Sequence, residues 1–136
     1  MKSLLRLIYT SRSSVPFDEA SLENLLEKAR RNNYHTGITG VLSFGNGFFL
    51  QVLEGPEREL VNLYSKIMAD PRHRDCAILD IHLTHQRLFS NWTMGFVGEV
   101  KKIGGHYNEM LDYRIVRKDP ERTRNLLNSL LEIVTE

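Results

Sequence analysis

The chain has 136 residues, which suits one domain with a short extension and is too few for two full domains. Its 18 lysines and arginines against 17 acidic residues give no overall charge for gripping nucleic acid or an anionic membrane. Cys76 is the single cysteine, which excludes an internal disulfide and a cysteine metal cluster and fits a reducing cytoplasm. Without a signal-peptide core or an apolar run of about 18 residues, a soluble, cytoplasmic protein is expected.

The first elements of the chain read as a strand followed by a helix. Residues 4–10 alternate between two faces, and the alternation points Tyr9 into the core. Asp18 is suited to cap a helix, and the apolar spacing that follows predicts a helix ending near Arg31.

A hairpin and a second helix follow. Residues 37–44 and 48–54 are β-rich runs around Gly45-Asn46-Gly47, which tolerates the positive φ of a tight turn. Pro56 suits the first position of a helix, and helical spacing of apolar residues continues until Asp70. An antiparallel hairpin leading into a helix is therefore predicted.

Two more strands, over residues 76–83 and 92–100, complete the order βαββαββ. This order predicts an α+β, ferredoxin-like sandwich with two helices on one face of the sheet. Along the last strand, Trp92, Met94 and Phe96 alternate and are expected on one face. Such a stripe belongs to an ordinary core more often than to a cofactor pocket.

Residues 101–136 form a more polar tail, in which Gly104-Gly105 marks a break before a helical stretch within residues 107–115. A last helix starts near Asp119 and carries one apolar stripe: Leu126, Leu127, Leu130, Leu131 and Val134. Two helices cover only one sheet face, so this stripe is expected to dock on the other face or on a second subunit.

The buried amide of Gln51 is the most informative polar group, because it interrupts an apolar run in a central strand. Left unpaired, it would cost roughly 1–3 kcal/mol, so the protein or a ligand must satisfy it. Tyr9 raises the same question on the first strand. From patterning alone, the two groups either bond each other or the backbone, or they face a ligand.

The remaining polar side chains give no sign of a metal site or a catalytic nucleophile. Asn32 and Asn33 follow the first predicted helix, where amides usually satisfy the helix end. His82 and His85 face opposite ways on a strand, so no metal site is expected. Cys76 has no helix start beside it to activate a thiolate, and nucleophilic catalysis has little support.

Four segments, taken in order and spacing, resemble the BLUF family of blue-light receptors. They are residues 4–11, residues 33–40 with Gly-Ile-Thr-Gly at the end, residues 49–55 with Gln51, and Asn91-Trp92-Thr93-Met94. The resemblance covers about residues 1–100, which it implies to be a flavin-binding domain, with residues 101–136 outside it.

This resemblance implies FAD as cofactor and assigns roles to individual residues. Tyr9 would be the redox tyrosine and Gln51 the switching glutamine. Trp92 and Met94 would lie on the strand best placed to respond to the rearrangement of Gln51. Asn33, helped by Asn32, would hold the carbonyl edge of the flavin. The remaining candidate contacts are two aliphatic side chains on the ring faces and a polar cluster near the ribityl chain or phosphates: Leu25, Ile67, Asp70, Arg72 and His73.

The implied activity is signalling without turnover, so the protein is not expected to be an enzyme. The excited flavin would take an electron from Tyr9, a proton would follow through Gln51, and recombination would leave Gln51 rearranged. Output would pass through a downstream protein of unknown identity or a homo-oligomer, with no direct contact to nucleic acid or membrane.

Two other classes of protein share single features with this sequence. A small acylphosphatase-like hydrolase shares the predicted fold and needs an arginine beside an asparagine, for which Arg12 and Asn33 are candidates. A nucleic-acid module would stack bases on strand aromatics, but Phe44, Phe48 and Phe49 lack a surrounding basic stripe.

Overall fold

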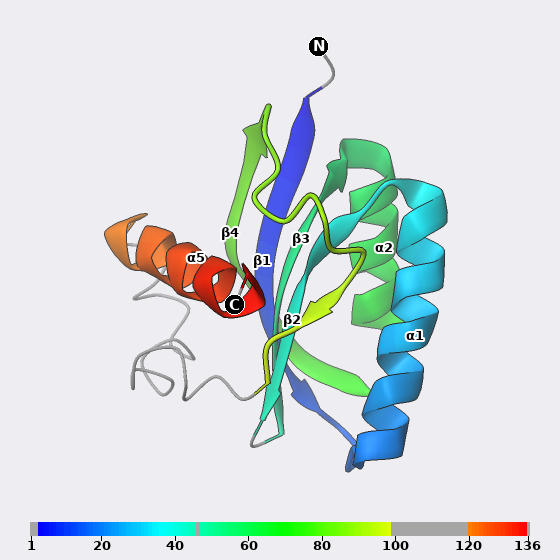
Figure 1. Ribbon diagram of the computed structural model, residues 1–136. Helices are drawn as coiled ribbons and strands as arrows, with labels where there is room; N and C mark the ends of the chain where they lie inside the picture. Colours follow the sequence, from blue (N-terminus) through cyan, green and yellow to red (C-terminus); the bar gives the residue numbers. More distant parts are fainter. Residues whose placement is uncertain (1–2, 46, 99–119, 136) are drawn as a thin grey trace.

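The computed structural model describes residues 3–45, 47–98 and 120–135 (Figure 1). Its elements, in chain order, are β1 (Leu4–Ser13), α1 (Glu19–Thr36), β2 (Thr39–Gly45), β3 (Phe48–Pro56), α2 (Glu57–Ala69), β4 (His73–Thr84), β5 (Gly95–Phe96) and α5 (Pro120–Thr135). Among the helices described, none is both long and apolar enough to cross a lipid bilayer.

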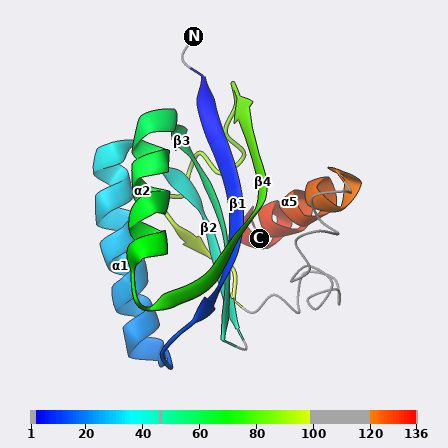
Figure 2. The same cartoon turned by 180° about the vertical axis from the view of Figure 1, so that it is seen from behind.

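One five-stranded sheet, in the order β4-β1-β3-β2-β5, organises the molecule. β1 pairs antiparallel with both β3 and β4, β2 and β3 form the predicted hairpin, and β5 runs parallel to β2. α1 and α2 cover one face, while α5 lies against the other (Figures 1 and 2). The predicted ferredoxin-like α+β fold, with two helices on one sheet face, is confirmed.

The sheet separates two hydrophobic cores. The core under α1 and α2 contains the odd-numbered side chains of β1, including Leu5, Leu7 and Tyr9. On the opposite face, Ile8 of β1 packs in a core that also holds Leu126, Leu127 and Leu130 of α5, with Leu131 against it. The last helix therefore docks on the face that α1 and α2 leave open, as one of the two predicted alternatives required. Val134 of the predicted stripe lies outside the described side chains.

The first helix is longer than predicted. Asp18 caps α1 as expected, because its carboxylate accepts a hydrogen bond from the Ser21 amide at 2.7 Å. The helix then runs past Arg31 to Thr36 and ends at Gly37, which adopts the left-handed conformation with φ of 75°. The prediction that it ends near Arg31 is wrong because Asn33 does not cap it: its side-chain amide is bonded to a distant carbonyl, at Thr93.

The last predicted strand is also wrong in extent. β5 comprises only Gly95–Phe96, and residues 99–100 lie outside the described residues, as does the predicted helix within 107–115. Without strand pairing before Gly95, the expected alternation fails. Met94 is 2% exposed under α1 and α2, whereas Trp92 packs against the core of the α5 side and Phe96 is 40% exposed.

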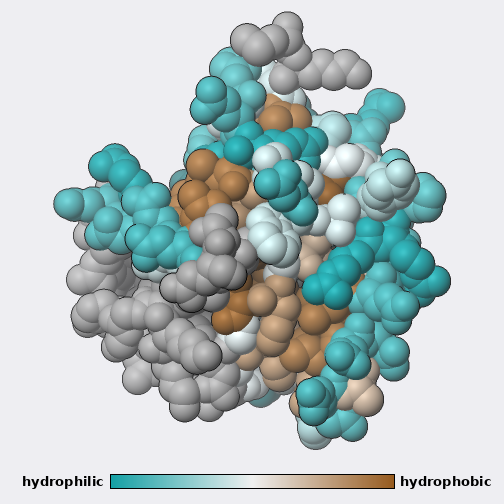
Figure 3. Space-filling model, in the orientation of Figure 1, coloured by the Kyte–Doolittle hydropathy of each residue, from teal (hydrophilic) through white to brown (hydrophobic). Residues whose placement is uncertain are grey.

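In space-filling view, hydrophilic residues cover the flank formed by α1, and hydrophobic residues gather over the middle of the same face of the molecule (Figure 3). The flank is exposed to water along charged positions such as Glu19, Glu23 and Glu27.

Candidate functional site

A cavity of about 220 Å³ lies where α1 and α2 pack on the sheet. β1, β2 and β3 supply residues at its inner end, the two helices supply its sides, and the residues after α2 complete its lining. Fifteen residues line it: Tyr9, Leu25, Lys28, Ala29, Asn32, Asn33, Leu42, Phe49, Gln51, Leu63, Lys66, Ile67, Asp70, Arg72 and His73. Every cofactor-binding candidate taken from the sequence is in this set.

Tyr9 and Gln51 form a hydrogen-bonded pair at the cavity. They are direct neighbours across β1 and β3, and the Tyr9 hydroxyl donates to Oε1 of Gln51. The amide nitrogen of Gln51 in turn donates to the thioether of Met94 at 3.3 Å. Burial raises the pKa of Tyr9 well above its usual value, with smaller contributions from Cys76 and Tyr64, so the phenol stays protonated and able to donate.

The two asparagines lie in the last turn and a half of α1, inside the helix rather than beyond it. Both line the cavity, and Asn33 is only 2% exposed. Its Nδ2 donates to the carbonyl of Thr93 at 2.6 Å, which ties the cavity to the segment that carries Met94. An amide at this position can present donor and acceptor atoms to a ligand that itself has both.

The two helices line the cavity with both aliphatic and polar side chains, and the residues past the end of α2 are polar. Leu25 of α1 and Ile67 of α2 line it and also pack, partly buried, against the core. Lys28 and Lys66 line it as well. Sequence reasoning missed these two lysines, although they stand close to Leu25 and Ile67 on the same helices.

Past α2, Asp70 and Arg72 make a tight ion pair, with Nη2 of Arg72 at 2.6 Å from Oδ2 of Asp70. The side-chain bonds of Arg72, opposed by partial burial and aided by its backbone amide, lower the pKa of Asp70 to about 2. His73 lies 2.9 Å from the hydroxyl of Ser11, and its ring centroid is 4.7 Å from that of Phe49. Burial is the largest cause of its lowered pKa, which Asp70 opposes. The polar end thus presents a fixed arginine and a mostly neutral histidine.

Comparison with known proteins decides the family. A family model described as sensors of blue light using FAD, abbreviated BLUF, matches residues 4–95. The chain belongs to the BLUF family.

Its sequence relatives include subunits of the photoactivated adenylate cyclases of Euglena. The beta subunit from Euglena longa is 38% identical over 93 residues, or 68% of this chain, and the alpha subunit from Euglena gracilis is 36% identical over 94 residues, or 67%. The chain spans only 11% and 9% of those proteins' lengths.

Several solved structures resemble most of the chain. The dark-state structure of BlrB has a TM-score of 0.81 at 29% identity and covers 97% of this chain and 98% of its own. The photo-activated state of BlsA has a TM-score of 0.79 at 27% identity, with 94% of each chain covered. A bacterial light-regulated adenylyl cyclase matches with a TM-score of 0.75 at 27% identity over 85% of this chain and 36% of its own.

Within this BLUF fold, the two residues expected to feel the switch separate. The Met94 thioether accepts directly from the Gln51 amide. Trp92 does not line the cavity and packs toward the face that bears α5. The two side chains part because residues 92–94 bend before β5 begins, instead of alternating along a strand.

The arginine required by the hydrolase alternative is not assembled with Asn33. Arg12 is about half exposed, lies 3.7 Å from the carboxylate of Asp75 and stacks over Phe48. It does not line the cavity. The BLUF reading is therefore favoured over the hydrolase, and the fully buried Phe49 is no platform for stacking bases.

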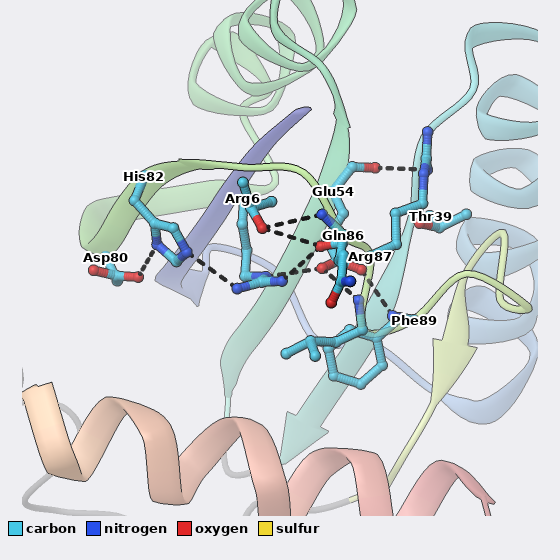
Figure 4. A network of polar contacts seen from close by, with 10 residues as sticks. Arg6, Thr39, Glu54, Asp80, His82, Gln86, Arg87 and Phe89 are labelled. Atoms are coloured by element: carbon cyan, nitrogen blue, oxygen red, sulfur yellow. Dashed lines mark hydrogen bonds and ion pairs between the residues drawn. The ribbon is translucent and has the colours of Figure 1, made fainter. Parts of the chain in front are cut away.

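A buried carboxylate network on the other sheet face escaped sequence reasoning (Figure 4). Glu54 of β3 is fully buried and accepts from Nε of Arg6 at 2.8 Å and from the backbone amides of Leu88 and Phe89 at 2.9 and 2.8 Å. Arg6 also contacts His82 at 3.1 Å. The ring of Phe89 points toward α5, with which it shares a core.

Proposed function

We propose that this chain is a blue-light receptor that binds FAD in the cavity between α1 and α2 and responds through Tyr9 and Gln51. The observation that carries the proposal is the donor-acceptor chain from Tyr9 through Gln51 to Met94, lying at the cavity in a BLUF protein.

The lining residues fit such a cofactor by their chemistry. Leu25 and Ile67, one on each helix, suit the two faces of a flat ring system. The amides of Asn33 and Asn32 suit a ring edge that carries both carbonyl and N–H groups. Protein groups also satisfy the buried amides: no buried side-chain nitrogen or oxygen in the described residues lacks a hydrogen-bond partner. The fit therefore rests on the shape and donor set of the cavity, and not on unpaired amides.

The phosphate-bearing part of FAD would lie at the polar end. Arg72 is held in place by Asp70, and His73 by its contacts with Ser11 and Phe49. Lys28 and Lys66 add positive charge along the cavity. Arginine and lysine are the side chains that bind phosphate best, so we assign this end to the diphosphate and ribityl chain.

Bound FAD would supply a ring that absorbs blue light and can take up an electron. Tyr9 would donate that electron, and its hydroxyl proton would move along the hydrogen bond to Gln51. Once electron and proton have returned to Tyr9, Gln51 would be left with its amide donor and acceptor rearranged. Because Tyr9 and Gln51 are both neutral, the exchange leaves no unpaired charge in the core at its end points.

The response consumes no substrate, so we propose a receptor and not an enzyme. We assign light sensing to residues 1–100 and output to residues 101–136, which contain α5. Output would pass to another protein or to a second copy of the chain. A cytoplasmic location agrees with the free thiol of Cys76.

The deciding experiment is to purify the full chain, reconstitute it with FAD and record absorption spectra in darkness, under blue light and after return to darkness. We expect about one non-covalent flavin per chain and a small red shift that reverses in the dark. FMN serves as the control for cofactor form. A chain that takes up neither flavin contradicts the proposal.

A further inference from the structure

The segment just before β5 is held by both β2 and α1. The Trp92 carbonyl accepts from the backbone amide of Gly40 in β2 at 2.9 Å, whereas the next two residues precede the paired positions of β5 and their carbonyls need other donors. Nδ2 of Asn33 donates to the Thr93 carbonyl at 2.6 Å, and Nε of Arg30 donates to the Met94 carbonyl at 2.9 Å. Two side chains, one turn apart on α1, thus hold two consecutive carbonyls.

The Met94 side chain is placed by this backbone rather than by its own polar contact. Its thioether accepts from Gln51 at 3.3 Å, but a thioether is a weak acceptor and a methionine side chain is flexible. Met94 is 2% exposed, and its main chain lies at the boundary between the bend and β5. A movement of the main chain at Met94 therefore moves the acceptor of the Gln51 amide.

We propose that Arg30 is a positioning residue for the Gln51 switch: by holding the Met94 carbonyl, it fixes the thioether against the Gln51 amide in the dark. Arg30 lies on the exposed side of α1, beside Glu27 and Phe96, and does not line the flavin cavity. It acts on Gln51 only through Met94. The photochemical consequence of this proposal rests on the proposed function, whereas the placement of Met94 does not.

The placement is tested by NMR of the full chain labelled with ¹³C-methyl methionine. Arg30→Leu removes the donor, and Arg31→Leu removes the same charge one residue further along α1. The Met94 methyl resonance, assigned with Met94→Leu, should shift or broaden in Arg30→Leu and stay in place in Arg31→Leu. An unmoved Met94 resonance in Arg30→Leu, or equal changes in both variants, overturns the proposal.

The consequence for the switch is tested on the FAD-loaded chain by the rate of dark recovery. Arg30→Leu should change this rate by roughly two- to tenfold, the range that corresponds to one hydrogen bond. Arg31→Leu should not, and Arg30→Lys, which keeps a charged donor, should restore most of the parent rate. In a Met94→Ala background the effect of Arg30→Leu should vanish, because the two residues act in series. An effect that persists without Met94 overturns the route through Met94.

Absence of any light response in the parent would instead contradict the proposed function, and the NMR result would still decide the placement of Met94.

Discussion

Gln51 and Glu54 belong to the same strand, β3, and face opposite sides of the sheet. The Gln51 amide meets Tyr9 and Met94 at the cavity, whereas the Glu54 carboxylate meets Arg6 and the backbone that carries Phe89. One strand, β3, therefore carries both a residue of the proposed photochemical switch and a residue that holds the backbone on which α5 packs.

Tyr9→Phe should keep fold and flavin but abolish the light-induced red shift, since it removes the hydroxyl that donates to Gln51. Tyr64→Phe is the matched control, because its ring packs edge-on against Tyr9 at 5.2 Å without bonding Gln51. Flavin content and difference spectra are measured for both. A full, reversible shift in Tyr9→Phe would remove Tyr9 from the switch.

Gln51→Leu should likewise bind flavin and lose the red shift, because leucine cannot pass a proton or exchange donor for acceptor. The Tyr9 hydroxyl then loses its partner inside the core, so the free energy of unfolding should fall by about 1–3 kcal/mol. Difference spectra and urea denaturation check the two effects separately. A variant that retains the shift would show that the switch lies elsewhere.

Ile67→Ala tests whether α2 contacts the flavin. Leu60→Ala on the same helix is the control, since Leu60 is fully buried in the core and does not line the cavity. Truncating Leu60 should cost about 2–5 kcal/mol, and the partly buried Ile67 less. Added FAD stabilises by mass action, and this gain should shrink only in Ile67→Ala. The measurement is the melting temperature of each variant with and without FAD. An equal FAD-dependent gain in both variants would show that Ile67 is an ordinary core residue that does not contact the flavin.

Glu54→Leu should be among the most damaging substitutions away from the cavity. It leaves the guanidinium of Arg6 and two backbone N–H groups buried without their acceptor, and breaking a buried pair in this way costs about 3–5 kcal/mol. Adding Arg6→Met should recover part of the loss. Arg12→Met, which breaks a largely exposed pair, should cost at most about 1 kcal/mol. Urea denaturation that ranks Glu54→Leu with Arg12→Met would contradict the network's role.

His73 should make the fold sensitive to mild acid. Burial lowers its pKa in the folded chain, so the unfolded chain binds the proton more readily, and stability should fall as pH drops below about 6.5. Asp70, with its pKa of about 2, stays ionised in this range and adds nothing to the slope. His73→Phe should flatten the fall in stability below about pH 6.5 relative to His85→Asn, a change at an exposed histidine. Equal slopes in the two variants would assign the acid sensitivity to other groups.

Much of this architecture could be predicted from patterns that are local in the sequence. Alternation along residues 4–10 placed Tyr9 in the core, and the family motif led to every cofactor candidate that now lines the cavity. The end of α1 was not predictable in the same way, because Asn33 is indistinguishable from a helix cap until its partner at Thr93 is known. Glu54 stands at the end of an apolar strand. One of its partners, Arg6, comes from another strand, and the other two are backbone amides more than thirty residues later, which carry no sequence pattern.

A single sheet separates the cavity from α5, and this limits how a structural change at the cavity can be transmitted to α5. Alternate side chains of β3 project from one main chain, so a tilt or slide of that chain displaces both faces together. A rotation of the Gln51 side chain alone leaves Glu54 and its hold on Phe89 unchanged. A light-induced change would consequently reach α5 as a displacement of the β3 backbone. If β3 stays fixed, the hydrogen bonds at the cavity would rearrange and recover without any change at α5.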